Sequence, residues 1–263
     1  MIRGKMEKII FFGNGLLADS ALAVLKEHCE IVFHARTKAD LDKVRELKTS
    51  DPNLHGVLAS FGVIIPKPIL NLFEPEGILN IHPSLLPAYR GSSPIESAIL
   101  AGDNDFSVSV MKLAETMDAG PIYWQTTLSN LPLCKNEIYK TLAETGAKWI
   151  NDNLTNLPTP TPQDHKKATF CGKFNKTMSL LTPETDSAKQ TLRKIIAYQN
   201  YPKPKYAFFG HICIILKAHM LEEGETAVLE LPCADGQILA IDELQPEGKK
   251  PMTAKAFKNG YAK

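Results

Sequence analysis

The sequence predicts an α/β protein in which a domain with a mostly parallel sheet is followed by a small β-rich domain. Over residues 8–151, strand-like and helix-like segments alternate at a spacing typical of βαβ units. A run of alternating prolines at residues 157–163 then forms a stiff, extended connector. Beyond it, short strand-like pieces are separated by glycine, proline and acidic turns. These observations predict two domains, residues 1–182 and residues 183–263.

The first part of the alternating region contains three strand-like and two helical segments. In order, they are a strand at 8–12, a helix at 16–27, a strand at 30–35, a helix at 39–48 and a strand at 57–61. The turn Gly13-Asn14-Gly15 joins the first strand to the first helix. We therefore expect three parallel strands joined by crossover helices.

The remaining segments complete the first domain and build the second. They are a short segment at 66–73, a strand at 78–81, a helix at 94–100, strands at 106–113 and 122–128, a helix at 136–151, a helix opening at Thr182-Pro183-Glu184, and strands at 212–216, 227–231 and 238–241. Ligands of parallel sheets bind beyond the carboxyl ends of the strands, so we expect a site there.

Composition excludes several classes of protein. The net charge of +1, with 44% hydrophobic and 22% charged residues, is typical of a soluble globular chain, and no apolar run approaches the roughly 18 residues that a membrane span needs. The start of the chain has no signal-peptide core. The five cysteines show no metal-ligand spacing and no disulfide framework. We expect a cytoplasmic protein with no metal, membrane or DNA partner.

Positive charge is concentrated in one segment. Between His165 and His219 there are ten lysines and arginines, against only Glu184 and Asp186. This asymmetry fits an anionic partner such as RNA. A solvated basic face explains the same charges equally well.

A small set of polar side chains gathers at one predicted strand end. Asn80 and His82 are two residues apart in an apolar strand that Pro83 ends, so both side chains project from the same face. Asp118 lies in the loop between two later strands that return to this edge. An amide can stabilise an oxyanion, an imidazole can move a proton, and a carboxylate can pair with that imidazole. The set suits acyl transfer.

The motifs around these residues resemble a known family. The string Asn80-x-His82-x-Ser84-Leu85-Leu86-Pro87, with the distant Asp118-x-Gly120, is similar to the formyltransferases that use 10-formyltetrahydrofolate. Within that family, the strings at 60–66, 168–170 and 244–252 resemble the methionyl-tRNA formyltransferases, so the resemblance extends nearly from end to end.

The resemblance implies a Rossmann-like formyltransferase domain and an OB-like C-terminal domain. It implies formyl transfer from 10-formyltetrahydrofolate, as co-substrate, to the amino group of methionyl initiator tRNA. It also implies that Asn80, His82 and Asp118 occupy the family's catalytic positions. The residues implied in folate binding are Ser84, Leu85, Leu86, Pro87, Phe61, Gly62 and Ile65.

We expect a shortened member of this family, and the features that suggest this leave its acceptor open. Family members that act on tRNA carry a basic loop after the second strand, whereas here Arg36-Thr37-Lys38 leads directly into a helix. Only some 60 residues follow Pro202. The alternative acceptor is a nucleotide-linked amino sugar, used by relatives with the same catalytic core.

Two further functions belong to different classes. Gly13-Asn14-Gly15-Leu16-Leu17-Ala18 fits the dinucleotide fingerprint Gly-x-Gly-x-x-Ala, and Arg36 is placed to face an NADP 2′-phosphate, as in an NADP-dependent oxidoreductase. A non-catalytic RNA-binding protein on the same scaffold would use the basic segment and its aromatic residues.

Overall fold

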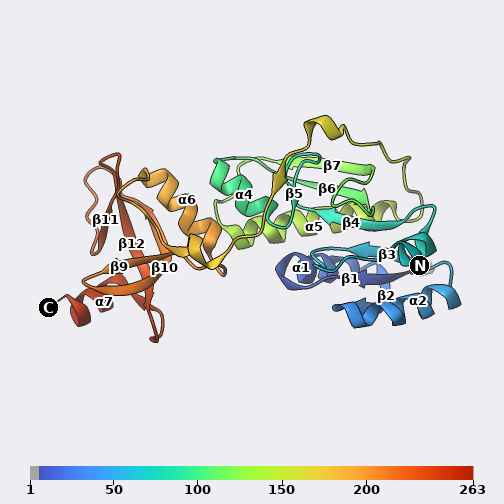
Figure 1. Cartoon of the computed structure of the whole chain (residues 1–263), viewed down its shortest axis with the longest axis horizontal. Helices are drawn as coiled ribbons and strands as arrows, with labels where there is room; N and C mark the ends of the chain where they lie inside the picture. The colour runs from blue at the N-terminus through green and yellow to red at the C-terminus, as the bar shows by residue number, and fades with distance from the viewer. Residues whose placement is uncertain (1–5, 263) are drawn as a thin grey trace. The chain divides into compact units, whose positions relative to one another are not determined.

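The computed structural model describes residues 6–262, and the residues on which the signal-peptide prediction rests, 1–5, lie outside that range. The chain divides into two compact units (Figure 1). One contains Met1–Ile95 and Asn104–Gly172, and the other contains Glu96–Asp103 and Lys173–Lys263. The predicted fold class, a mostly parallel α/β sheet followed by a small β-rich unit, is confirmed.

The first unit is built on a six-stranded sheet of order β2-β1-β3-β4-β6-β7. Its strands are β1 (Glu7–Phe12), β2 (Cys29–Ala35), β3 (His55–Leu58), β4 (Ile78–His82), β6 (Phe106–Lys112) and β7 (Ile122–Leu128). The first four are parallel to one another, and β6 and β7 continue the sheet in antiparallel pairing. The strand β4 is therefore central, with neighbours on both sides.

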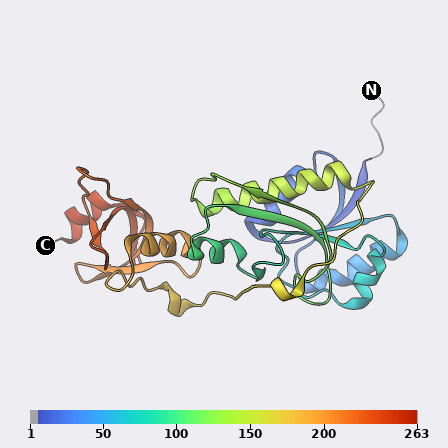
Figure 2. The same cartoon turned by 90° about the horizontal axis from the view of Figure 1, so that it is seen from above.

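Helices cover both faces of this sheet. They are α1 (Gly15–Leu25), η1 (Lys38–Asp40), α2 (Leu41–Ser50), α3 (Lys67–Leu70), η2 (Asn71–Phe73), α5 (Lys135–Asn153) and η3 (His165–Lys167). Figure 2 shows α1 and α5 on one face and α2 with α3 on the other. Ile10 and Phe12 pack in the core beneath α2 and α3, while the alternate residues Ile9 and Phe11 are equally buried. This two-sided burial explains why the strand is continuously apolar.

A two-stranded ladder lies beside this sheet. β5 (Arg90–Gly91) pairs in parallel with β8 (Phe170–Cys171), so residues eighty positions apart in the sequence are neighbours. A side chain on Gly91 would collide with the backbone oxygen of Cys171, because an ideal Cβ lies 2.1 Å from that atom. Glycine is therefore required for the close approach of the two segments.

The second unit is an antiparallel sheet packed against helices. Its elements are the part of α4 (Pro94–Ala101) from Glu96 onward, η4 (Lys176–Ser179), α6 (Ala188–Tyr198), β9 (Lys205–Phe208), β10 (His211–Met220), β11 (Glu230–Pro232), β12 (Ile238–Pro246), β13 (Met252–Thr253) and α7 (Ala254–Tyr261). The strand order is β11-β12-β10-β9, with β13 also on β12. Ile195, Ile215, Leu244 and Phe257 are fully buried in its core. This unit has its own hydrophobic core.

The cysteines are thiols rather than disulfides. Of the five, which all lie in the described part of the chain, only Cys134 is exposed. Burial raises the pKa of Cys29 and of Cys213 to about 11, so neither is a reactive thiolate near neutral pH. None of the helices within residues 6–262 combines the length and the apolar character that crossing a bilayer requires.

Candidate active site

The carboxyl end of β4 places Asn80 and His82 on one face of the sheet. The two residues alternate with Ile81, whose side chain is fully buried among the packed core residues, and each is only 5% exposed. In the antiparallel ladder with β6, His82 lies opposite Ser109. Because β4 is paired with β3 on one side and with β6 on the other, the backbone from which both polar side chains project is held in place.

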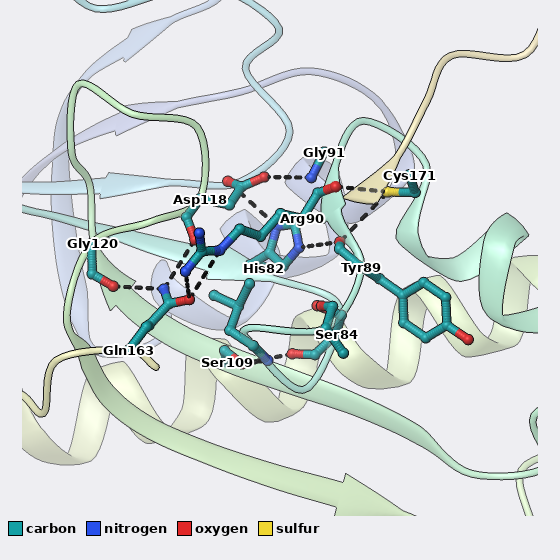
Figure 3. Close-up of polar contacts among 12 residues, drawn as sticks. His82, Ser84, Tyr89, Arg90, Gly91, Ser109, Asp118, Gly120, Gln163 and Cys171 are labelled. Carbon is teal, nitrogen blue, oxygen red and sulfur yellow. Dashed lines mark hydrogen bonds and ion pairs between the residues drawn. The ribbon is translucent and has the colours of Figure 1, made fainter. Parts of the chain in front are cut away.

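Asp118 reaches His82 from the loop between β6 and β7. Its Oδ1 is 3.7 Å from His82 Nδ1, and its Oδ2 accepts a hydrogen bond of 2.8 Å from the backbone N–H of Gly91 (Figure 3). The Asp118 backbone is left-handed, with φ of 48°, a conformation that costs energy for a residue with a side chain. The predicted approach of the Asp118 loop to the end of β4 is thus present in the structure.

The backbone carbonyl of Tyr89 shows which nitrogen of the His82 ring is a donor. His82 Nε2 lies 3.1 Å from the Tyr89 oxygen, and because a carbonyl only accepts, Nε2 carries the hydrogen of that bond. Nδ1 in the neutral ring is then an unprotonated acceptor beside the Asp118 carboxylate. The ring can take a proton at Nδ1 and become a cation paired with Asp118.

The Asn80 amide is a donor with no partner among the residues that the structure describes. Within residues 6–262 its side chain makes no hydrogen bond, although every fully buried side-chain nitrogen or oxygen in this range is satisfied. The amide atoms must therefore reach solvent through the small exposed part of the residue. A donor at this position is available to a bound molecule.

Residues 84–87 form a rigid turn after β4. The Ser84 hydroxyl donates to the Ala88 carbonyl at 2.6 Å, and the Ser84 carbonyl accepts from Ser109 Oγ at 2.6 Å. The Gln125 amide donates to the Leu86 carbonyl and to Ser109 Oγ, both at 2.8 Å. Leu86 is buried while Leu85 is 46% exposed. The turn therefore presents Leu85 on a fixed backbone.

The segment after β3 presents a different side chain from those predicted. Phe61 and Ile65 are each 5% exposed and belong to the hydrophobic core of the sheet. Gly62 is exposed, and Ile64, which is not one of the predicted folate-binding residues, is 87% exposed. Because β3 and β4 are adjacent and parallel, Ile64 and Leu85 follow strand ends at the same edge. Two apolar side chains are thus available to a ligand there.

Three residues outside the predicted site form a chain of contacts that ends at the Asp118 loop. Arg90, only 3% exposed, donates through Nε and Nη2 to the Gln163 oxygen at 3.1 and 2.5 Å, and its Nη2 lies 3.1 Å from His165 Nδ1. No local pattern marks this group, because Arg90 and Gln163 are 73 positions apart. Closeness to the motif turn marks Arg90 alone, which lies three residues after Pro87, and does not mark Gln163 or His165.

Comparison with known proteins identifies the family. The formyl transferase model matches residues 15–154, more than half of the chain, and the model of the formyl transferase C-terminal domain matches residues 176–262. The chain belongs to the formyl transferase family. It is a formyltransferase, as its motifs predict.

Curated relatives of this formyltransferase carry a more specific name. The methionyl-tRNA formyltransferase of Carboxydothermus hydrogenoformans is 36% identical over 220 residues, covering 78% of this chain and 71% of the relative. That of Pseudoalteromonas translucida is 31% identical over 273 residues, covering 94% and 82%. The resemblance that the sequence motifs indicated is therefore confirmed over most of the chain.

Solved structures share the fold of this formyltransferase. HypX from Aquifex aeolicus, in complex with tetrahydrofolic acid, has a TM-score of 0.74 at 17% identity over 99% of this chain, which spans about half the length of HypX, 48%. A methionyl-tRNA formyltransferase from Clostridium thermocellum has a TM-score of 0.65 at 19% identity, covering 92% of this chain and 99% of that one. The sugar 3N-formyl transferase WlaRD, crystallised with dTDP and 5-N-formyl-THF, has a TM-score of 0.65 at 19% identity, covering 94% and 100%.

The glycine-rich turn of the formyltransferase has a packing explanation. Gly13 has φ of +154°, and an ideal Cβ there would lie 2.0 Å from the Ala59 backbone oxygen. Close approach of the turn to the loop after β3 therefore requires glycine without any dinucleotide. Among residues 6–262, no group of three or more His, Cys, Asp or Glu side chains is arranged to hold a metal ion.

Proposed function

We propose that this formyltransferase transfers a formyl group from 10-formyltetrahydrofolate to the amino group of methionyl initiator tRNA. The observation that carries the chemistry is the grouping of a donor amide, an imidazole and a carboxylate at Asn80, His82 and Asp118. The acceptor is supported by the names of the curated relatives, which match most of the chain.

The residues at the strand edge fit a folate. Its flat, partly apolar ring system needs exposed apolar side chains beside backbone polar groups. Leu85 and Ile64 supply the apolar surface, and the rigid turn Ser84–Pro87 together with the exposed Gly62 supplies backbone groups. The side chains of Phe61 and Ile65 would act from beneath, by holding the loop. The folate supplies the formyl carbonyl and a nitrogen leaving group.

Asn80 and His82 would share the work of the transfer. When the acceptor amine forms its bond to the formyl carbon, negative charge develops on the formyl oxygen, and the free Asn80 amide would donate a hydrogen bond to it. The amine nitrogen must lose a proton, which His82 Nδ1 would accept. The ring would then return this proton to the folate nitrogen as its bond to the formyl carbon breaks.

Asp118 would stabilise the His82 ring while it holds the proton. The carboxylate lies 3.7 Å from Nδ1, and the pair is shielded from solvent, with side chains 6% and 13% exposed. The Gly91 N–H keeps the carboxylate in place through Oδ2. An α-amino group, with an ordinary pKa of about 8, is partly neutral at pH 7 and can attack without a stronger base.

A nucleotide-linked amino sugar is the second candidate acceptor. The segment after β2 favours it: the Asp40 carboxylate accepts from the N–H groups of Arg36 and Thr37, which lowers the pKa of Asp40 and closes a tight turn into η1. This turn replaces the basic loop by which family members that act on tRNA reach the acceptor stem. The fold likeness to WlaRD is consistent with this alternative.

A direct transfer assay decides between the acceptors. Purified protein receives 10-formyltetrahydrofolate labelled in the formyl group, with either methionyl initiator tRNA or a dTDP-linked amino sugar. We expect label on the tRNA, with a rate that falls at least about tenfold between 50 and 200 mM salt because phosphate contacts release counterions. Label on the sugar alone, with little effect of salt on the rate, would identify the amino sugar as the acceptor. Uncharged tRNA is the negative control, because it lacks the aminoacyl group whose amine accepts the formyl group.

A further inference from the structure

Gln163 is a buried side-chain amide at the centre of the contacts that surround Asp118. It comes from the proline-rich connector, yet it is only 7% exposed. Figure 3 shows its amide between the Arg90 guanidinium and the loop that contains Asp118 and Gly120. A connector that serves only as a spacer has no need of a buried amide, so the burial of Gln163 indicates a specific role.

All the hydrogen-bonding capacity of this amide is used on two segments. Nε2 donates to the backbone oxygens of Asp118 at 2.9 Å and Gly120 at 2.7 Å. Oε1 accepts from Arg90 Nε at 3.1 Å and Nη2 at 2.5 Å. A carboxamide has two N–H groups and two lone pairs, so the four bonds saturate it. Any rotation or shift of Gln163 breaks at least one of them.

The two segments that Gln163 joins are the ones that determine the position of the Asp118 carboxylate. One is the Asp118 loop itself, whose left-handed backbone needs restraint from its surroundings. The other is β5, where Gly91, next to Arg90, donates its N–H to Asp118 Oδ2. Gln163 therefore fixes the carboxylate relative to its own hydrogen-bond donor.

Arg90 is held at its far side by His165. The guanidinium is always charged and only donates, so the His165 Nδ1 that lies 3.1 Å from Nη2 is the acceptor. This contact keeps the Arg90 fork aimed at Gln163. The chain of contacts thus leads from His165 through Arg90 and Gln163 to the backbone of Asp118.

We infer that Gln163 is a positioning residue for formyl transfer, which acts by holding the Asp118 carboxylate against His82. The expected effect on the transfer rate rests on the proposed function. The expected effect on the position of Asp118 rests only on the contacts described above. Gln163 does not touch the reacting atoms; its effect on rate passes entirely through Asp118.

Gln163→Glu tests this role with the fold preserved. The new carboxylate keeps an acceptor for Arg90 and adds an ion pair, but it places an oxygen against the Asp118 and Gly120 carbonyls. We expect the single-turnover transfer rate to fall about tenfold to hundredfold, because small displacements of a catalytic group have effects of this size, while KM for the folate stays within about twofold. Gln237→Glu, at an exposed turn of the second unit, is the matched control.

The double variant with Asp118→Ala shows whether the effect passes through Asp118. In that background Gln163→Glu should lower the rate by less than about twofold. A further tenfold loss there, or a wild-type rate for folded Gln163→Glu alone, overturns the inference. Gln163→Met, which keeps the side-chain length, is measured in the same way if the glutamate variant does not fold.

Hydrogen exchange of the Gly91 amide separates this inference from the proposed function. Its N–H is bonded to Asp118 Oδ2, so exchange should quicken in Gln163→Glu and in Asp118→Ala, but not in Gln237→Glu. Unchanged exchange in Gln163→Glu rules out the positioning role. A wild-type protein that formylates neither acceptor defeats the proposed function, whereas the exchange result still decides whether Gln163 holds Asp118.

Discussion

Replacing Asp118 by asparagine removes one charge at the centre of the site and little else. The asparagine oxygen can still accept from the Gly91 N–H, and asparagine tolerates the left-handed backbone at this position. At an effective dielectric constant of about 20, two unit charges 3.7 Å apart attract by about 4.5 kcal/mol. Since 1.36 kcal/mol is a tenfold change in rate, complete loss of this attraction would slow the transfer by about three orders of magnitude.

We expect Asp118→Asn to lower the single-turnover rate of formyl transfer by about a hundredfold to a thousandfold. Rapid mixing of enzyme in excess over labelled 10-formyltetrahydrofolate, with quenching at set times, measures this rate without product release. Circular dichroism and the thermal midpoint check the fold. A loss of less than about tenfold in a protein that is folded normally would refute the electrostatic role given to Asp118.

Three other predictions test separate parts of the structure. Asn80→Ala should slow transfer about a hundredfold in the same assay, since it removes the oxyanion donor; a change of a few-fold would contradict that role. Hydrogen bonds to Asp242 and Glu225 raise the pKa of His219 above 6.5, so these contacts stabilise the fold fully below pH 6.5 and are lost as the pH rises through the higher folded value. The stability difference between wild type and His219→Gln, from urea unfolding, should therefore shrink between pH 6 and 9, and a constant difference would be inconsistent with this. Gly13→Ala should cost about 3 kcal/mol or more in unfolding free energy, against about 1 kcal/mol for Gly236→Ala, whose Cβ meets nothing within 4 Å; equal costs would show that the contact with Ala59 is relieved.

The main elements were predicted well because amphipathic helices and continuously apolar buried strands each leave a recognisable pattern in the sequence. The parallel strands were found from continuous apolar runs, and β4 with Asn80 and His82 lies within one residue of its predicted end. Boundaries were displaced where backbone geometry ends an element before the apolar run does. β3 ends at Leu58 because Ser60 has φ of 53°, so Phe61 enters the core from a loop.

Other elements depend on contacts that sequence pattern does not contain. The helix expected to open at Thr182 begins at Ala188, because Ser187 and Gln190 form a capping box there and residues 182–186 form turns. β9 and α7 were not predicted, since each is short and stabilised by packing in the second core. Asn80, His82 and Asp118 were found as a motif, whereas Gln163 is recognisable only once distant segments are brought together.

The left-handed backbone of Asp118 has an evolutionary consequence. A single-base substitution converts an aspartate codon into an asparagine codon, and asparagine adopts this conformation more readily than most residues. A lineage released from the need for the reaction could therefore accept that substitution without added backbone strain and keep producing an inert protein. Retention of the acid at position 118 would then reflect selection on chemistry, which makes this one codon a marker for activity across lineages.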